Sequence, residues 1–393
     1  MTEYLISGDK EKCCGCSACV QACPVSAITF APDDEGFLYP EINKSLCVKC
    51  GRCKQVCPYD SAVCGNAPLK TYAMINQNSE ELLNSSSGGA FIALANRIIK
   101  DGGFVCGCIF NEELKAIHIL SSNSAAVKKM QGSKYVQSDP GGVYAEIKDK
   151  LENGKAVLFS GTPCQVDGLK KYLGKEYAML YTADLICHGV PSPRLLADFI
   201  ESEKVVGKNI TDIKFRDKKR NGWRSCGAVE FSDGSKKRKK TISPFNNSYY
   251  QLYYLLNNVS RPCCYSCRYS NTNRVGDVTI GDYWNIADIL PKIDTSGGVS
   301  AVLVNTEKGD RLIEKIRDGA ILAETPLKAA VAGNGNLSAP CQKPDSRDDI
   351  YKRIAENGYA AVAEKECHYK RVMPFIRRHM PKGLKTALKK ILK

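Results

Sequence analysis

Two runs of cysteines carry the clearest chemistry in this sequence. Each has the spacing C-x2-C-x2-C-x3-C-P, and the run that begins at Cys13 recurs from Cys47. Bacterial ferredoxins hold two four-iron clusters with this run, and the fourth cysteine of each run binds the other cluster. Zinc also binds C-x2-C pairs, but a four-coordinate zinc site does not explain eight cysteines in a crossed repeat. The predicted ligands are Cys13, Cys16, Cys19 and Cys57 for one 4Fe-4S cluster, and Cys47, Cys50, Cys53 and Cys23 for the other.

Four more cysteines are candidates for a third cluster. Cys164 follows the strand-like run Ala156–Phe159, at a turn into an amphipathic stretch, and Cys187 ends a second strand-like run. Parallel α/β proteins place working residues at such strand ends, so the two thiols are expected at one sheet edge. Cys264 and Cys267 add a C-x2-C pair, which completes the four thiols that a 4Fe-4S cluster needs.

Other interpretations of these cysteines stay open. Cys164 could be a nucleophile with His188 as its base, or a structural cysteine, although a hydrolase would not explain the C-x2-C pair. Cys14 and Cys263 fit neither ligand pattern and are interpreted as unligated neighbours. The cysteines without partners at ligand spacing, which we interpret as structural, are Cys64, Cys106, Cys108, Cys226, Cys341 and Cys367.

Composition indicates a globular chain that works in a reducing compartment. The chain has 393 residues, of which 43% are apolar and 25% charged, enough for two or three domains. Its first residues lack the pattern of a signal peptide, and no apolar stretch reaches the length of a membrane span. Twenty cysteines in such a chain favour metal or redox chemistry over disulfides. A cytoplasmic location is expected.

Beyond residue 60 the pattern changes from cysteine runs to alternating strands and helices. Residues 61–70 resemble a linker. The elements expected after it are strands over Thr71–Ile75, Phe104–Phe110, Ile117–Leu120, Ala156–Phe159, Met179–Ile186, Ser300–Asn305 and Ala320–Ala323, and helices over Ala90–Lys100, Val143–Leu151, Val166–Leu173 and Gly309–Arg317. This alternation predicts an α+β or α/β fold, in which a mixed-sheet α/β body follows the dicluster ferredoxin domain.

Several motifs in this body resemble a known family. In order they are SSGGAFIALANRIIKDGGFVCG, MQGSKYVQSD, VLFSGTPCQVDGL, DLICHGVPSP, FRDKKRNGW and RPCCYSCRYSNTNRVGDVTIGDYW. Together they are similar to the beta subunit family of coenzyme F-420 hydrogenase and dehydrogenase, with a dicluster ferredoxin domain fused in front. The resemblance spans roughly residues 71–366. It implies a flavin-binding body, usually for FAD, with an iron–sulfur cluster beside it.

The resemblance also indicates domains and flavin contacts. The expected division is a dicluster domain at 1–60, a linker at 61–70, the body in two parts at 71–150 and 151–366, and a basic tail at 367–393. Serines and glycines before the helix at Ala90 could bind the FAD pyrophosphate, or they could only cap that helix. The flavin-site candidates carried over by motif are Ser87, Gly88, Gly89, Gly132, Ser133, Lys134, Tyr135, Ser160 and Thr162.

These features predict an iron–sulfur flavoprotein oxidoreductase. Electrons would pass from a low-potential donor through the clusters to FAD and then to an organic substrate, such as a glycan precursor in a surface-polysaccharide pathway. No general acid or base is indicated. The alternatives are an electron-transfer subunit of a larger complex, an F-420-reducing oxidoreductase, and a cluster-bearing binding module without catalysis.

Charge is concentrated in two segments of the chain. Lys214–Lys240 holds eleven basic and three acidic residues, and Cys367–Lys393 holds nine basic residues and no acid. Either could be plain solvated charge, and no stacking or helix-turn-helix pattern indicates nucleic acid. Such a basic segment could also dock ferredoxin or another acidic redox partner. The stripe over residues 384–392 predicts an amphipathic tail helix that packs on the body or a partner, or contacts an anionic membrane peripherally.

Overall fold

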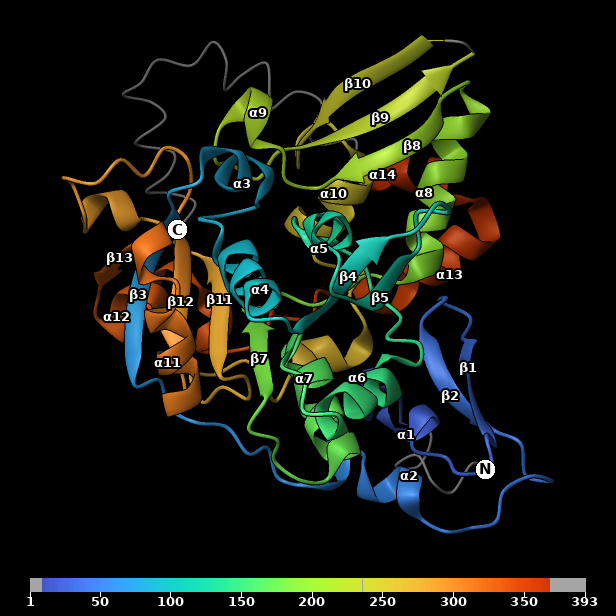
Figure 1. Ribbon diagram of the computed structural model, residues 1–393. Coiled ribbons are helices and arrows are strands. Elements are labelled where there is room, and N and C mark those ends of the chain that lie inside the picture. The colour runs from blue at the N-terminus through green and yellow to red at the C-terminus, as the bar shows by residue number, and fades with distance from the viewer. Residues whose placement is uncertain (1–8, 235, 368–393) are drawn as a thin grey trace.

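A computed structural model describes residues 9–234 and 236–367 (Figure 1). The tail helix predicted over residues 384–392 lies outside the described residues. The chain begins with a small cysteine-rich domain, continues into a large sheet with helices on both faces, and ends in a helical layer beside a three-stranded sheet. None of the described helices is long and apolar enough to cross a membrane.

The cysteine-rich domain shows the internal repeat of its sequence in its backbone. Its short helices are α1 (Ala18–Gln21) and α2 (Arg52–Gln55), and its hairpin pairs β1 (Ile28–Pro32) with β2 (Leu38–Ile42). Each helix follows a residue in the left-handed region, Ser17 at φ 63° and Gly51 at φ 76°. The two cysteine runs therefore turn in the same way, as their shared spacing predicts.

One eight-stranded mixed sheet forms the centre of the body, in the order β13-β3-β12-β11-β7-β6-β4-β5. Its strands are β3 (Lys70–Asn76), β4 (Phe104–Phe110), β5 (Ala116–Ser121), β6 (Val157–Gly161), β7 (Leu180–Leu185), β11 (Val278–Asp282), β12 (Ser300–Val304) and β13 (Ala320–Glu324). The four central strands, β4, β6, β7 and β11, are parallel, and the outer pairings are antiparallel. The mixed α/β fold with a ferredoxin domain in front is confirmed.

Helices cover both faces of this sheet. They are α3 (Ser79–Asn84), α4 (Ala90–Lys100), α5 (Ser124–Met130), α6 (Val143–Glu152), α7 (Pro163–Leu173), α11 (Glu307–Glu314) and α12 (Leu327–Gly333). Apolar side chains of α4, α5 and α11 share one core with the sheet. Those of α6 and α7 form a second core, which also includes Cys16 and Ala18 of the ferredoxin domain. The ferredoxin domain thus packs on the α6–α7 side.

A second layer stands beside the main sheet. It contains α8 (Pro193–Val205), α9 (Lys218–Asn221), α10 (Ser248–Tyr250), α13 (Arg347–Asn357), α14 (Tyr359–Cys367) and the antiparallel sheet β8 (Asn209–Lys214), β9 (Gly227–Asp233) and β10 (Lys236–Ile242). The basic run KKRKK forms much of strand β10. Figure 1 shows this sheet at the opposite end of the molecule from α1 and α2.

Most predicted boundaries agree with the structure to within a few residues. The helix over Ala90–Lys100 matches α4, and the linker over 61–70 ends where β3 begins. The clearest difference is α7, which begins at Pro163 rather than at Val166. The two predicted parts of the body share the main sheet, since β3, β4 and β5 come from the first part and the other strands from the second.

Candidate functional site

The cysteines predicted from strand ends do meet at one edge of the main sheet. Strands β6, β7 and β11 are parallel, so their carboxyl ends lie at the same edge, where α/β sheets bind ligands. A cavity of about 290 Å³ lies there, close to the lower end of the range for ligand pockets. Its lining includes all four cysteines of the predicted third cluster, Cys164, Cys187, Cys264 and Cys267.

Local structure explains where each of these thiols lies. Cys164 is the second residue of α7, whose start is held by Gln165, because the Gln165 Oε1 atom accepts hydrogen bonds from the Thr162 N–H at 3.0 Å and the Thr162 hydroxyl at 3.1 Å. Cys187 follows β7 after one residue, Ile186. Cys264 and Cys267 belong to the 3₁₀ turn Pro262–Ser266 and its end.

The four thiols interact with one another, and two further thiols join them. The Cys187 thiol is close enough to those of Cys164 and Cys267 that burial and these neighbours raise its pKa. Cys14 of the ferredoxin domain reaches the same cavity, where its contact with the Cys164 thiol and burial raise the pKa of Cys164. Cys263 lines the cavity as well. The interpretation of both as unligated neighbours stays a prediction, and each stands in a Cys-Cys doublet beside a predicted ligand.

The cysteine set suits a four-iron cluster. In the described part of the chain, no three Cys, His, Asp or Glu side chains already converge on one metal ion. A four-iron cluster does not require such convergence, because each thiolate binds a different iron. The same holds for the ferredoxin cysteines, whose spacing is that of a cluster domain. Buried thiols next to like thiols are otherwise unfavourable as thiolates, so the crowding itself fits a cationic iron core.

The predicted ferredoxin ligands separate into an inner and an outer group. Burial raises the pKa of Cys19, as do the nearby thiols of Cys13 and Cys57 from the same predicted set and of Cys53 from the second set. Cys16 and Cys19 are buried. Cys50 of the second set is exposed, and its companions Cys23, Cys47 and Cys53 are half-buried.

Two arginines connect the first cluster loop to the third cysteine group. Arg261 and Arg268 bracket the segment PCCYSC. The buried Arg261 donates to the carbonyl of Cys13 at 2.7 Å and lies over the Tyr39 ring at 3.9 Å. Arg268 donates to the carbonyl of Pro58, the residue after Cys57, at 2.9 Å. Both ends of the C-x2-C segment are therefore fixed to the backbone beside predicted ligands of the first cluster.

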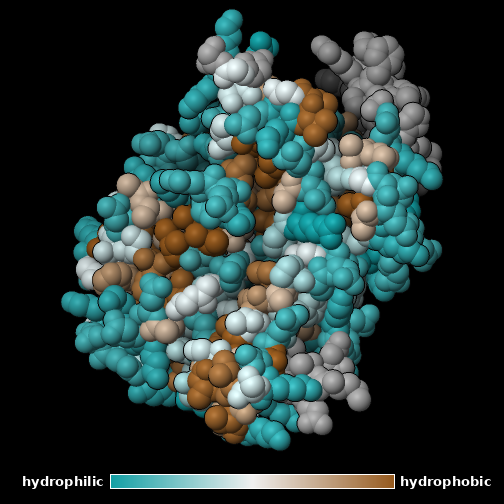
Figure 2. Space-filling view, turned by 90° about the vertical axis from the view of Figure 1, so that its right-hand side faces the viewer, coloured by the Kyte–Doolittle hydropathy of each residue, from teal (hydrophilic) through white to brown (hydrophobic). Residues whose placement is uncertain are grey.

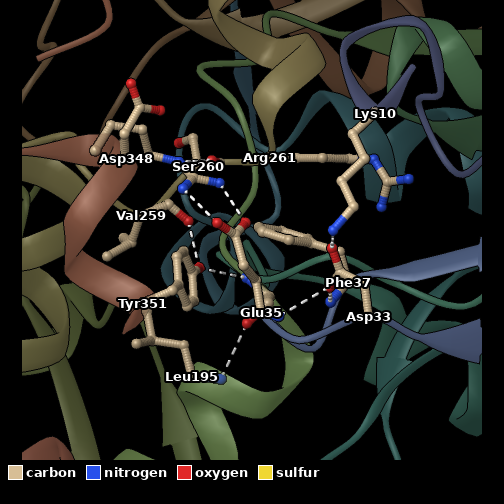
Figure 3. Close-up of polar contacts among 12 residues, drawn as sticks. Lys10, Asp33, Glu35, Phe37, Leu195, Val259, Ser260, Arg261, Asp348 and Tyr351 are labelled. Atoms are coloured by element: carbon tan, nitrogen blue, oxygen red, sulfur yellow. Dashed lines mark hydrogen bonds and ion pairs between the residues drawn. The ribbon is translucent and has the colours of Figure 1, made fainter. Parts of the chain in front are cut away.

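Further buried contacts hold the ferredoxin domain on the body. The Tyr144 hydroxyl lies 2.8 Å from the carbonyl of Cys16, two residues before α1, and 3.0 Å from the carbonyl of Gln165 on α7. Glu35 accepts two hydrogen bonds from Arg347, at 2.9 and 2.6 Å. Figure 3 shows Glu35 pointing into the body beside Tyr351. The domain is thus tied down at several points, which fixes the separation of its clusters from the cavity.

The same cavity collects most of the flavin-site candidates. Of the nine, those that line it are Ser87, Gly89, Gly132, Ser133, Lys134, Tyr135, Ser160 and Thr162. Gly88 does not line the cavity. A Cβ there would lie 2.0 Å from the Met74 carbonyl oxygen. This glycine is required for packing against β3, so it says nothing about a phosphate. Gly89 adopts φ 85° and packs against Asn76, which also explains a glycine without a ligand.

Two of the candidate segments are joined by direct hydrogen bonds. The Ser86 hydroxyl accepts from the Ser133 N–H at 2.9 Å, so the loop before α4 contacts the loop after α5. The Lys134 ammonium donates to the carbonyls of residues 129–132, between 2.8 and 3.2 Å, and thus closes the end of α5. Burial lowers the pKa of Lys134 to about 8.

A polar group that sequence reasoning did not single out lies at the end of β11. Asp282 lines the cavity and accepts hydrogen bonds from Arg216 at 2.6 Å and from the Trp223 indole at 2.8 Å. Trp223 stacks on Trp284 with ring centres 4.9 Å apart. The signal was available, because these residues belong to the quoted motifs FRDKKRNGW and GDYW.

Comparison with known proteins identifies two parts of the chain. Residues 12–61 match the family described as 4Fe-4S dicluster domain, and residues 154–330 match the family described as the C terminus of the Coenzyme F420 hydrogenase/dehydrogenase beta subunit. Residues 154–330 are therefore similar to the C-terminal part of this beta subunit family, and a dicluster ferredoxin domain stands in front of them, as the sequence resemblance indicated. The chain is an iron–sulfur electron-transfer protein related to the F420 hydrogenase beta subunit.

The other comparisons add little. A search of curated proteins finds no match. Among solved structures, one similar chain comes from "Xenon derivatization of the F420-reducing [NiFe] hydrogenase complex from Methanosarcina barkeri". Its TM-score is 0.45 at 15% identity, over 76% of this chain and 96% of that chain.

Proposed function

We propose that this chain is an oxidoreductase that carries electrons from a low-potential donor through three 4Fe-4S clusters to FAD and on to an organic substrate. The observation that supports this most is the cavity, in which four cysteines and eight flavin-site candidates line one space against the ferredoxin domain. Clusters exchange single electrons and a flavin exchanges one or two, so together they would supply the redox chemistry.

The residues of this chain provide position and shielding. Cys164, Cys187, Cys264 and Cys267 would hold the third cluster. The segments around Ser87 and Ser133 would hold the flavin, with the start of α4 directed toward its phosphates. Arg261 and Arg268 keep the third cysteine group against the first cluster loop.

The direct test is the cofactor content of anaerobically purified protein. We expect about twelve iron atoms per chain, from three four-iron clusters, together with one noncovalently bound FAD. An iron content that stays near eight would remove the third cluster, and absence of flavin would leave a cluster-bearing module without catalysis.

A second candidate function follows from the family match. Because the family is described as a hydrogenase and dehydrogenase beta subunit, the chain could serve as the electron-transfer subunit of a larger complex, or reduce coenzyme F-420. Assays with F-420 and with reduced ferredoxin as alternative electron carriers distinguish these from turnover of a small molecule or glycan precursor by the chain alone.

A further inference from the structure

The second predicted cluster lies at the open end of the ferredoxin domain. Cys50 is exposed, whereas Cys16 and Cys19 of the first cluster are buried against the body. A Cβ built on Gly168 of α7 would lie 2.9 Å from the Cys16 sulfur, but one on Gly51 would meet no atom within 4 Å. The order from solvent inward is therefore second cluster, first cluster, third cysteine group.

The surface around this open end is basic. Residues 42–59 contain four cations and no acid, although residues 1–60 as a whole hold six basic and eight acidic residues. Two exposed acids, Glu41 and Asp60, border this segment, and three other acids of the domain already have partners: Asp9 pairs with Lys12, Asp33 with Lys10 and Glu35 with Arg347. The exposed cations of the segment, which form no ion pair with another described residue, are Lys44, Lys49, Arg52 and Lys54.

Large apolar side chains stand exposed among these cations. Leu46 is 51% exposed and Val48 is 61% exposed, on either side of Cys47. Figure 2 shows a hydrophobic patch bordered by hydrophilic residues at the lower end of the face that carries the ferredoxin domain. Exposed apolar residues within a charged rim are typical of a protein contact rather than of plain solvated surface.

We infer that residues 44–54 form the docking surface for an acidic one-electron carrier protein. The inference rests on the proposed function in one respect, that electrons enter through the ferredoxin domain. The four cations complement a negatively charged partner and would speed its approach, while Leu46 and Val48 exclude water from the contact. A cluster with its thiolates is itself anionic, and the cations around it offset that charge.

The other basic segment is less suited to this role. Lys214–Lys240 lies in and around the three-stranded sheet, which Figure 1 places at the opposite end of the molecule from α2. A carrier bound there would be far from every predicted ferredoxin ligand. This segment provides the matched control, because the same number of charges can be reversed on β10.

The test compares two charge-reversed variants of the full-length holoprotein. The docking variant is Lys49→Glu, Arg52→Glu and Lys54→Glu, and the control is Lys236→Glu, Lys237→Glu and Lys240→Glu. The probe is an acidic plant-type ferredoxin, whose Kd is measured anaerobically at low and high salt. We expect the docking variant to raise Kd at least about tenfold and to lose most of the salt dependence, with the control within about twofold of wild type.

Two further measurements keep the outcome clear. Iron content and reduction by dithionite show whether the docking variant keeps its clusters. If it loses them, two milder variants replace it: Lys49→Gln with Lys54→Gln, and separately Leu46→Ser with Val48→Ser. A docking variant that binds ferredoxin as tightly as wild type, or a control that weakens binding more, overturns the inference. A missing third cluster or FAD would contradict the proposed function while leaving this binding difference intact.

Discussion

Spacing alone does not indicate where Cys14 and Cys263 lie in the fold. Neither fits a ligand run, yet both line the cavity with the four predicted ligands. Their neighbours Cys13 and Cys264 belong to predicted ligand sets, so each doublet joins a predicted ligand to a thiol that lines the cavity. Local patterns identify ligands, but they do not indicate which non-ligand thiols the fold brings beside them.

The first residue-scale prediction separates ligands from neighbours. Cys264→Ser should lower the iron content by about four atoms per chain and leave the ferredoxin clusters intact, because one missing thiolate opens a cluster of four ligands. Cys14→Ser and Cys263→Ser should keep wild-type iron. Iron analysis and low-temperature EPR measure both effects.

Cys226→Ser is the control, since this thiol lies outside the cavity lining. Loss of iron from Cys14→Ser equal to that from Cys264→Ser would make Cys14 a ligand and change the assignment.

The second residue-scale prediction concerns His118. Its ring is buried and stacks on Phe159 with ring centres 5.7 Å apart, and burial lowers its pKa to about 4, from 6.5. The unfolded chain therefore binds a proton at His118 that the native state does not bind. This ring lowers the free energy of unfolding as pH falls from 6.5 toward 4. Replacing His118 with Phe should remove a loss of about 2 kcal/mol between pH 7 and pH 5.

The measurement is the free energy of unfolding in denaturant at both pH values. The difference between the variant and wild type isolates His118 from the carboxylates that titrate in the same range. If His118→Phe loses as much free energy of unfolding between pH 7 and pH 5 as wild type does, the ring accepts a proton in the native state.

At the scale of elements, sequence periodicity predicts regular segments well and their ends less well. The helix over Ala90–Lys100 is confirmed because its apolar spacing and the glycines before it both indicate the start. The apolar spacing of α7 begins only at Val166, so it predicts a start three residues after the observed one at Pro163. The capping signal was present as Thr162-Pro163-Cys164-Gln165, with proline at the first helical position.

That cap gives the element-scale prediction. Gln165→Met keeps the volume of the side chain but removes the acceptor for Thr162 and the donor to the Ser138 hydroxyl at 3.0 Å. We expect a loss of about 1–2 kcal/mol in the free energy of unfolding, since these half-buried polar partners lose their hydrogen bonds to Gln165. The exposed Gln342→Met is the control and should change stability little.

Because Cys164 belongs to the first turn of α7, the same variant should release iron faster from the proposed third cluster than from the other two. Iron-release kinetics with a chelator measure this. Equal release from all clusters would show that the cap stabilises the body without positioning Cys164.

At the scale of the whole molecule, the position of the ferredoxin domain was beyond sequence reasoning. The cluster runs are local patterns, and the edge of the main sheet follows from alternating strands and helices, so both could be predicted. The contacts that join them involve Arg261, Arg268 and Arg347, which are far in sequence from Cys13, Pro58 and Glu35. No local pattern indicates such pairs, since each depends on the folded arrangement of two units.

The buried ion pair between Glu35 and Arg347 gives the last prediction. The Arg347 side chain is 2% exposed and also donates to the Ser260 carbonyl, one residue before Arg261. Glu35→Gln keeps the shape but leaves a buried cation without its counter-charge, at a cost of about 2 kcal/mol, below the fully buried range because Glu35 is 22% exposed. Hydrogen exchange should therefore become up to about thirtyfold faster in peptides covering residues 33–42 and 258–262.

The control is Asp348→Asn, which changes a residue on the same helix as Arg347. It removes an exposed partner of Lys343 and should leave exchange unchanged. Unchanged exchange in Glu35→Gln would mean that Arg261 and Tyr144 hold the domain without this pair, whereas a local increase with full iron content would show that the pair maintains the docking between clusters.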